Sequence, residues 1–227
     1  MKYTLLCIGL ALFQGLLLLD FQGPIRVLLL WSILSCLIVA WAYAAQKPLL
    51  IMGKRRDGGF SWFRLILNLP WLLFTWLTWW GIAALIREDA MNHIEGTGIH
   101  LSRWPLFGVD LSEFDLVIDL GAELPPWYRV GAAYEALPNL DDMPLQVCQP
   151  TSPIDRQTRL LIHCAQGHGR TASMATLLLI DLGFAQNVDE ARRMILNARP
   201  RARMSEAQRH FIQRRVAERS GTSEQTG

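Results

Sequence analysis

Cysteine and histidine are scarce in this chain of 227 residues, which contains four cysteines and five histidines. They do not stand at the spacings typical of a zinc site, so we expect neither a metal nor a cofactor. Lysine is also rare. No lysine follows Lys54, where arginine is used instead. No basic stretch is interleaved with aromatic residues as in nucleic-acid-binding motifs, so we expect no nucleic-acid partner.

Charge is nearly absent from three long stretches of the first 86 residues. These apolar runs are Leu5–Leu19, Ile25–Ala45 and Phe60–Ile86. A helix that crosses a bilayer needs roughly 20 apolar residues, which the second and third runs supply and the first barely approaches. No small-x-small cleavage site precedes the second run, which argues against a signal peptide. We therefore predict a membrane anchor over residues 1–86 with about three transmembrane helices, or two if the first run does not span.

The loop between the second and third runs is basic and carries Lys54, Arg55 and Arg56. Short basic loops prefer the cytoplasm, so three spanning helices would place the following domain on the far side, in the periplasm or its equivalent. Seven of the nine tryptophans lie at or before Trp80, as expected for aromatic residues at a lipid–water boundary.

An eleven-residue segment in the second half of the chain has the composition of a phosphate-binding loop. Its sequence is His163-Cys164-Ala165-Gln166-Gly167-His168-Gly169-Arg170-Thr171-Ala172-Ser173. The apolar run 160–162 before it predicts a buried strand, and residues 172–182 after it predict a helix. A loop between a strand and a helix N-terminus directs backbone N–H groups and the positive helix dipole towards an anion.

Each residue type in this loop has a definite chemical use. Gly167 and Gly169 permit backbone conformations with positive φ. Arg170 offers a planar fork that matches two phosphate oxygens. The same positive field stabilises a thiolate at Cys164, which is a nucleophile for phosphorus. The predicted phosphate-binding residues are Ala165, Gln166, Gly167, His168, Gly169 and Arg170.

Two neighbours of Cys164 are expected to support it. We expect Thr171 to donate a hydrogen bond to the sulfur when it leaves, and His163 to orient the loop rather than to transfer protons. A free cysteine is more often an inert buried thiol, but the spacing to Arg170 and the strand-to-helix context argue against that interpretation here. A non-catalytic membrane scaffold that binds phosphate without turnover stays an alternative.

The loop resembles the signature of the cysteine-dependent phosphatases, His-Cys-x5-Arg-Thr/Ser. Its flanks, over Ile99–Ala217, resemble the dual-specificity branch of that superfamily, including membrane-anchored bacterial members. The resemblance implies an α/β fold with a small central sheet flanked by helices, preceded here by the N-terminal transmembrane helices. It also implies hydrolysis of phosphomonoesters through a phosphocysteine intermediate. We therefore expect an integral protein of a bacterial inner membrane, with the basic loop favouring a periplasmic catalytic domain.

The same resemblance identifies candidates for the general acid that protonates the leaving group. The segment Leu137–Pro144 is similar to the family segment that carries this acid, and Asp141 is the best positional match. Asp142 stays an alternative and Asp155 a weaker one. The stretch from Asp141 to Cys164 is shorter than is usual in the family, and its three prolines predict that the helix normally found there is interrupted.

Two loop positions bear on the substrate. Relatives that act on polyphosphorylated inositides carry lysines inside the loop, where this chain has Ala165 and His168. We therefore expect a substrate with one phosphate, although His168 can contact a second anion when protonated. Phosphotyrosine, phosphoserine or phosphothreonine on proteins is the first predicted class. A phospholipid headgroup, such as that of phosphatidylglycerophosphate, is the alternative, because a tethered site meets lipids at high effective concentration.

Charge divides the soluble part of the chain. Residues 87–155 carry three arginines and twelve acidic residues, a net charge of −9, whereas residues 156–219 carry twelve arginines and five acidic residues, a net charge of +7. The basic half contains Cys164, so a positive surface around the site would attract anionic substrate or lipid. Pairing between the two halves is expected to offset much of this charge.

Apolar periodicity and turn residues predict the elements of the soluble part. The predicted strands are Ile99–Arg103, Leu116–Leu120, Glu135–Leu140 and Arg159–His163. The predicted helices are Thr171–Leu182, Asp189–Ala198 and Glu206–Glu218. We expect a dual-specificity-phosphatase-like catalytic domain at residues 87–219, a solvated linker at Arg199–Arg203 and a disordered tail at residues 220–227.

Overall fold

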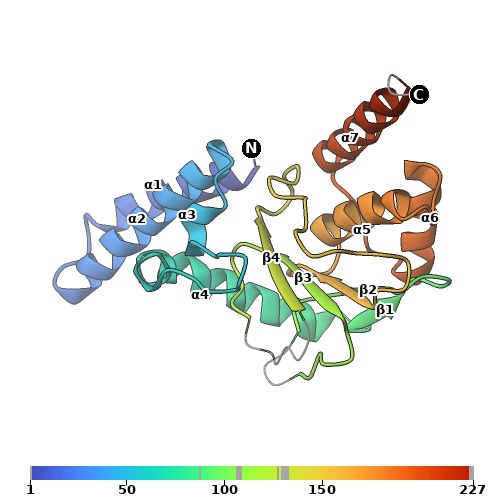
Figure 1. Ribbon diagram of the computed structural model, residues 1–227. Coiled ribbons are helices and arrows are strands. Elements are labelled where there is room, and N and C mark those ends of the chain that lie inside the picture. Colours follow the sequence, from blue (N-terminus) through green and yellow to red (C-terminus); the bar gives the residue numbers. More distant parts are fainter. Residues whose placement is uncertain (1, 87, 106–108, 127, 129–132, 225–227) are drawn as a thin grey trace. The chain divides into compact units, whose positions relative to one another are not determined.

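The computed structural model describes residues 2–86, 88–105, 109–126, 128 and 133–224. These residues form two compact units, each described here by itself (Figure 1). The N-terminal unit contains the chain up to Arg55, the stretch from Gly59 to the end of the apolar region, and the short segment Ala122–Pro125. The C-terminal unit contains Arg56–Gly58, Glu88–Gly121 and the chain from Pro126 onwards.

Four helices make up most of the N-terminal unit. They are α1 (Lys2–Leu17), α2 (Pro24–Ala44), α3 (Leu49–Met52) and α4 (Trp62–Leu85). α1 packs on α2, and the rings of Tyr3 and Tyr43 stack with their centroids 5.0 Å apart. Because that contact joins the start of α1 to the end of α2, the two helices form an antiparallel hairpin. Pro24 opens α2 at a position where its missing N–H is not needed.

Each of the three apolar runs forms a helix. By length and composition, α2 and α4 are able to cross a bilayer, whereas α1, with 16 residues, is shorter. At the start of α4 the Ser61 hydroxyl accepts a hydrogen bond from the Arg64 N–H. Pro70 removes one backbone donor from the middle of α4. Nearby, the Trp31 indole of α2 donates to the Leu67 carbonyl oxygen at 3.1 Å.

Five strands form the sheet of the C-terminal unit. They are β1 (Met91–His93), β2 (Ile99–Ser102), β3 (Leu116–Gly121), β4 (Ala133–Asn139) and β5 (Leu160–His163). Their order is β1-β2-β5-β3-β4, and every neighbouring pair is parallel except β1 and β2. β5 is therefore the middle strand, with a parallel partner on each side. All of its residues are buried, which explains the uninterrupted apolar run 160–162.

Three helices accompany the sheet: α5 (Gly169–Asp181), α6 (Val188–Ala198) and α7 (Glu206–Glu224). α5 packs on β2 and β5, and both α6 and α7 pack on α5 (Figure 1). α6 begins after Asn187, whose side chain accepts a hydrogen bond from the Glu190 N–H. Leucine, isoleucine, alanine and methionine side chains fill the core between the sheet and these helices. The predicted α/β class, a small central sheet flanked by helices, is confirmed.

The predicted elements agree with β2–β5 and α5–α7 to within a few residues, except at two places. β1 has no counterpart in the prediction, because three residues are too few to show an alternating pattern. α7 continues to Glu224 and takes in residues 220–224, which we expected to belong to a disordered tail. A helix that is already formed extends through weak helix formers at low cost. Residues 225–227 lie outside the described part of the chain.

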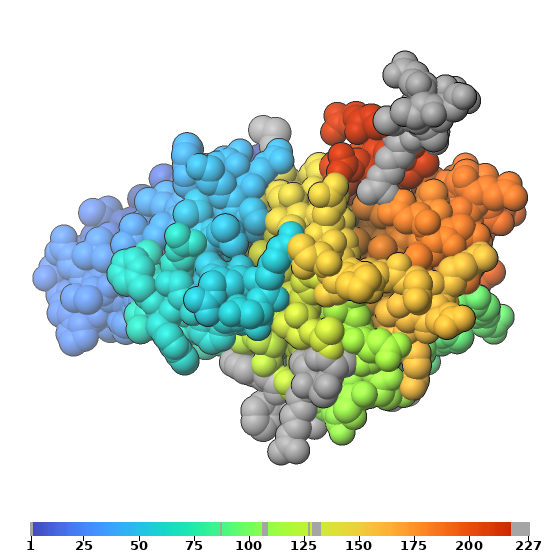
Figure 2. Space-filling model, in the orientation of Figure 1, coloured from blue at the N-terminus to red at the C-terminus, as the bar shows by residue number. Residues whose placement is uncertain are grey.

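The connection between β4 and β5 contains no helix. Residues 140–159, all of them described, form turns and extended chain, as the three prolines predict. Asn139 organises the connection, because its Oδ1 accepts hydrogen bonds from the N–H groups of Gln146 at 2.6 Å and Val147 at 2.9 Å. Figure 2 shows this connection in yellow at the surface of the C-terminal unit.

Candidate active site

The loop at Cys164 lies at the carboxyl end of the middle strand. β5 ends at His163, α5 begins at Gly169, and residues 164–168 connect them. Cys164 and Arg170 are buried, with exposures of 2% and 0%. The Thr171 hydroxyl is also buried, and it has no hydrogen-bond partner among the described residues. The structure therefore brings the predicted loop residues together in the strand–loop–helix arrangement of an anion site.

Two glycines let this loop pack closely against its neighbours. Gly167 has a φ of 68°, and a Cβ there would lie 2.5 Å from the carbonyl oxygen of Ser102 at the end of β2. A Cβ at Gly169 would lie 2.7 Å from Oε1 of Gln208 in α7. The loop is thereby fixed between β2 and α7, and a larger side chain at either position would displace it.

The structure brings Asp141 to the loop through Arg170. The Arg170 Nη1 donates to the Asn139 carbonyl oxygen at 2.9 Å, and its Nε lies 3.3 Å from Asp141 Oδ1. The Asp141 side chain is 43% exposed, so it combines contact with the loop and access to solvent.

The two rival carboxylates have different surroundings. Asp142 has a φ of 60°, and its backbone carbonyl accepts a hydrogen bond from the Ser205 hydroxyl at 3.2 Å. Asp155 lies in a turn, where its Oδ1 accepts hydrogen bonds from Gln157 N and from both N and Oγ1 of Thr158. The Thr158 hydroxyl, followed by these backbone donors, holds the pKa of Asp155 below its usual value, which is unfavourable for a proton donor.

A buried network of polar side chains holds His163, the residue before Cys164. The Tyr128 hydroxyl lies 2.6 Å from His163 Nε2 and 3.1 Å from Asp119 Oδ2. The Tyr134 hydroxyl donates to the same Asp119 oxygen at 2.8 Å. Because Tyr128 has one hydroxyl proton, donating it to the carboxylate requires His163 to carry a proton on Nε2. The network therefore selects one orientation and one protonated nitrogen of the imidazole ring.

The two tyrosines of this network stay protonated. Burial, followed by the charge of Asp119, raises the pKa of Tyr128 well above its usual value, and the same two causes raise the pKa of Tyr134. Both hydroxyls are therefore hydrogen-bond donors over the whole neutral range.

A second charged cluster contacts the loop at Gln166 and His168. His168 Nε2 lies 2.9 Å from Glu88 Oε2, and Arg199 Nη2 lies 3.2 Å from the same oxygen. Arg199 also donates to the Gln166 carbonyl oxygen at 3.1 Å and to the Asp89 carbonyl oxygen at 3.0 Å. One carboxylate thus connects a loop histidine to a buried arginine.

The position of Arg199 corrects the expectation of a solvated linker there. Its exposure is 1%, because the chain between α6 and α7 passes directly behind the loop and not through solvent. Burial lowers the pKa of Arg199, while the nearby charges of Glu88 and Cys164 act in the opposite direction. The sequence left open whether His168 faces solvent or contacts a second anion. In the structure its Nε2 lies within hydrogen-bonding distance of the Glu88 carboxylate.

Several residues around the loop were not identified as site residues from the sequence: Glu88, Asp119, Tyr128, Arg199 and Gln208. The sequence does indicate a special role for Asp119, because a carboxylate inside an apolar strand must find buried partners. Ser205 and Gln208 have the spacing of a capping box, and the Gln208 Oε1 accepts a hydrogen bond from the Ser205 N–H at 2.9 Å. Its Nε2, however, is buried without a hydrogen-bond partner among the described residues and lies against Gly169.

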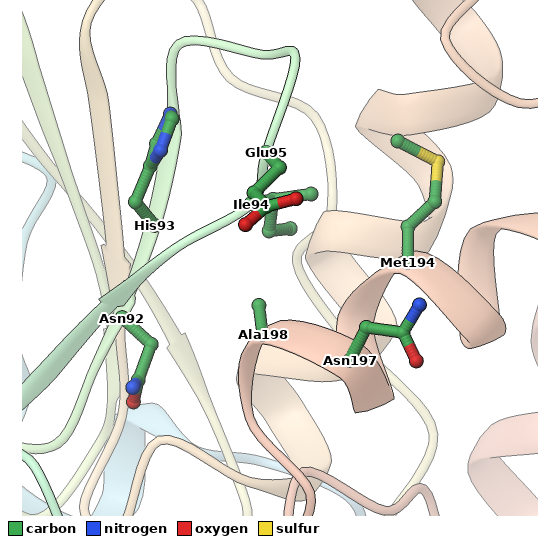
Figure 3. Close-up of a pocket in the computed structure, with 7 residues that line it drawn as sticks. All are labelled: Asn92, His93, Ile94, Glu95, Met194, Asn197 and Ala198. Atoms are coloured by element: carbon green, nitrogen blue, oxygen red, sulfur yellow. The ribbon is translucent and has the colours of Figure 1, made fainter.

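A separate pocket of about 440 Å³ lies between the β1–β2 hairpin and α6 (Figure 3). It is lined by Asn92, His93, Ile94, Glu95, Met194, Asn197 and Ala198. This lining contains neither an arginine nor a residue of the loop at Cys164. Its link to the charged cluster is Asn92, whose Oδ1 accepts a hydrogen bond from Arg199 Nη1 at 2.5 Å. The pocket therefore contains none of the residues that the sequence predicts to bind phosphate.

Comparison with protein families agrees with this geometry. Residues 138–226 match the family model PTP-SAK, described as the DSP-PTPase phosphatase domain of Swiss Army Knife proteins. The C-terminal unit is therefore similar, over residues 138–226, to a dual-specificity protein tyrosine phosphatase domain. The part of the chain that matches this phosphatase domain includes the Asp141 segment, the loop at Cys164 and helices α5–α7.

Three solved structures are similar to the chain at low sequence identity. Human DUSP28 is 16% identical with a TM-score of 0.47, over 58% of this chain and 99% of that one. PTPMT1 in complex with PI(5)P is 17% identical with a TM-score of 0.45, over 60% and 99%. Tk-PTP in the active form is 19% identical with a TM-score of 0.40, over 55% and 94%. No curated protein matches the chain significantly in sequence.

Proposed function

We propose that this protein is a membrane-anchored phosphatase that hydrolyses phosphomonoesters through a phosphocysteine intermediate. The observation that carries the proposal is the loop 164–170, in which Cys164 follows the middle strand and the buried Arg170 lies in the first turn of α5. The match of residues 138–226 to a dual-specificity phosphatase domain supports the reaction class. The residue roles below are inferred from the geometry of the loop.

In the first step, the thiolate of Cys164 attacks the phosphorus of the substrate. A sulfur–phosphorus bond forms while the bond from phosphorus to the leaving oxygen breaks. The N–H groups of residues 165–169 and the guanidinium of Arg170 bind the other phosphate oxygens. Asp141, in its acid form, donates a proton to the leaving oxygen, and its contact with Arg170 at 3.3 Å holds it beside the phosphate-binding loop.

In the second step, water hydrolyses the phosphocysteine. Asp141, now a carboxylate, takes a proton from the water, whose oxygen bonds to phosphorus as the sulfur–phosphorus bond breaks. The Thr171 hydroxyl, buried and without a hydrogen-bond partner among the described residues, donates to the departing sulfur. Inorganic phosphate leaves, and the thiolate of Cys164 is restored.

Phosphorylated tyrosine, serine or threonine on proteins is the substrate class that we favour. Within the loop, Arg170 is the one permanently charged side chain, because position 165 is alanine and position 168 is a histidine bonded to Glu88. A cradle with so few fixed positive charges suits a substrate with one phosphate group better than a polyphosphorylated one.

A phospholipid headgroup, such as that of phosphatidylglycerophosphate, is the second candidate. The observation that favours it is the N-terminal unit, in which α2 and α4 are long and apolar enough to cross a bilayer. A phosphatase held at a membrane meets lipid substrates at high effective concentration, although many tethered enzymes act on soluble partners.

Phosphate release by the purified full-length protein tests these alternatives. Phosphopeptides and phospholipids in mixed micelles are compared as substrates, with Cys164→Ser as the matched control that should release no phosphate from either. Faster turnover of the peptides supports the favoured class, and faster turnover of the lipids assigns the second. A protein that fails to hydrolyse even a small aryl phosphate, with Cys164 reduced, would be a phosphate-binding membrane scaffold and not an enzyme.

A further inference from the structure

The helix α4 is joined at both ends to residues that belong to the C-terminal unit. Before α4, the segment Arg56–Gly58 is part of that unit, and after α4 the unit begins again at Glu88. We propose that α4 does not cross the bilayer but lies along its surface, so that the basic loop before it and the phosphatase domain after it both face the cytoplasm. This placement is independent of the reaction that the domain catalyses.

The first attachment is made by Arg56. Its carbonyl oxygen accepts a hydrogen bond from the Ala136 N–H of β4 at 2.8 Å, so the segment continues the hydrogen bonding of an edge strand. Its guanidinium pairs with the carboxylate of Glu135, which is 3% exposed and also accepts a hydrogen bond from the Thr151 N–H at 2.8 Å. Breaking this pair would leave a buried carboxylate without its cation, so the attachment is stable.

Gly58 fixes the same segment sterically. A Cβ at Gly58 would lie 2.8 Å from Cε1 of the Tyr134 ring, which belongs to the buried network behind Cys164. The loop before α4 is therefore packed into the folded domain itself.

The second attachment is Glu88, three residues after the end of α4. Its carboxylate binds His168 in the phosphate loop and the buried Arg199. The next residues stay in the domain as well, because the Ala90 carbonyl oxygen accepts a hydrogen bond from the Arg103 N–H at 3.0 Å before β1 begins. The first described residues of the C-terminal unit after α4 thus contact its phosphate loop.

These two attachments are incompatible with a spanning helix. α4 has 24 residues and is about 36 Å long, enough to put its ends on opposite sides of a hydrocarbon core of about 30 Å. Trp62 is four positions after Gly58 and Glu88 is three positions after Leu85, so these connections reach at most about 14 Å and 11 Å. A single folded domain cannot hold both ends unless they lie on the same side.

The middle of α4 supports the same conclusion. The Trp76 indole donates to the Glu123 carbonyl oxygen at 2.9 Å, and Lys54 Nζ donates to the Leu124 carbonyl oxygen at 2.7 Å. Glu123 follows the last residue of β3, Gly121, by two positions. If α4 crossed the bilayer, Trp76 would draw this glutamate and its loop into the hydrocarbon region, where charge is costly and irregular chain is rarely tolerated.

The exposed face of α4 is chemically suited to a lipid surface. Its large exposed side chains are all apolar: Trp62, Phe63, Ile66, Leu73, Phe74, Leu77, Trp80, Ile82 and Leu85. The polar Asn68 points away from them and donates to the carbonyl oxygens of Leu50 and Ile51. A helix with one apolar, aromatic-rich face lies in the interface of a bilayer. The α1–α2 hairpin is then the embedded part, and Lys54 and Arg55 place the adjoining loop in the cytoplasm.

Cysteine labelling tests this arrangement. The background carries Cys148→Ser and Cys164→Ser and retains Cys7 and Cys36, which are buried. Asp57→Cys then reports the loop before α4, and Gln157→Cys, on an exposed turn, reports the domain after it. In spheroplasts of a bacterial host, neither position should react with a membrane-impermeant maleimide, and both should react after permeabilisation. Opposite labelling of the two positions would show that α4 spans, and labelling of both in intact spheroplasts would overturn the cytoplasmic assignment.

A measurement on the unsubstituted chain guards against misfolded variants. An epitope added at the C-terminus should be protected from protease in spheroplasts and exposed in everted vesicles. The reverse result would overturn the proposal even if phosphatase activity is confirmed, because the protease readout does not depend on turnover.

Discussion

The two sides of the phosphate loop are built in opposite ways. On the side of the middle strand, Cys164 continues from His163, whose partners Asp119 and Tyr128 are buried with it. On the side of the general acid candidate, Asp141 is 43% exposed and lies on a connection without a helix. The proposed nucleophile thus follows a histidine that buried hydrogen bonds hold, whereas the carboxylate of Asp141 contacts Arg170 at 3.3 Å.

This difference follows from the demands of the two chemical steps. A thiolate must remain fixed under the phosphorus within a few tenths of an ångström, and buried hydrogen bonds provide that rigidity. A general acid must serve leaving groups of different size and then admit water, which a partly exposed segment allows. The comparison predicts that substitutions on the two sides differ in kind as well as in size.

The largest expected effect comes from Cys164→Ser. Removing a covalent nucleophile should lower kcat by on the order of 10⁶-fold, to the level of the background. Phosphate binding should persist, because the backbone donors and Arg170 are unchanged. Phosphate release and isothermal titration with inorganic phosphate measure the two properties. Cys148→Ser, at the other free cysteine of the C-terminal unit, is the control and should keep full activity; substantial turnover by Cys164→Ser would refute the covalent mechanism.

The next effect separates Asp141 from Asp142. Asp141→Asn should slow alkyl phosphates by roughly 10² to 10⁴-fold, because a poor leaving group needs a proton, and should slow aryl phosphates with good leaving groups far less. Rates plotted against the pKa of the leaving group measure this dependence. If Asp142→Asn shows the steep dependence and Asp141→Asn does not, the acid lies one residue further along and the contact with Arg170 has another purpose.

A smaller effect is expected behind the strand, where two tyrosines provide a matched pair. Tyr128→Phe removes the hydroxyl that contacts both His163 and Asp119, whereas Tyr134→Phe removes one that contacts Asp119 and Tyr128 but not His163. Each should reduce the free energy of unfolding by about 1–3 kcal/mol, the cost of a lost buried partner. Only Tyr128→Phe should also lower kcat, by about tenfold, with KM unchanged. Equal kinetic effects in the two variants would show that the network acts on stability and not on the position of His163.

Most of the loop was predictable because its determinants are local. The spacing of Cys164 and Arg170, the glycines and the apolar run 160–162 are read from consecutive residues, and the structure shows the expected strand, loop and helix. The central sheet followed from apolar runs of β-strand length. The match of residues 138–226 to a dual-specificity phosphatase domain model agrees with the resemblance that this local pattern indicated.

The residues that brace the loop were not predictable in the same way. Glu88 meets His168 across a sequence separation of 80 residues, and Arg199 reaches Gln166 across 33. Neither the periodicity of apolar residues nor the spacing of residues in the sequence indicates such contacts, because they form only when the sheet and its helices are assembled. Arg199 looked like part of a solvated linker for this reason, since a run rich in arginine beside a proline has the composition of a surface loop.

The smallest expected effect is on the free energy of unfolding at alkaline pH, through the two tyrosines of the buried network at His163. In the unfolded chain tyrosine ionises near pH 10, whereas burial and Asp119 raise the pKa of both Tyr128 and Tyr134 in the folded state. Below about pH 10 both states keep these protons and the two residues add no pH dependence. Above it only the unfolded state releases them, so the free energy of unfolding should fall by up to about 1.4 kcal/mol per pH unit for each tyrosine.

Urea unfolding in detergent between pH 8 and pH 11 measures this slope, and the double variant Tyr128→Phe/Tyr134→Phe should flatten it. The Asp141 side offers no such buried phenol, so Asp141→Asn should leave the slope unchanged; a flattened slope in that variant would mean that the two sides of the loop are not the separate structures that the comparison assumes.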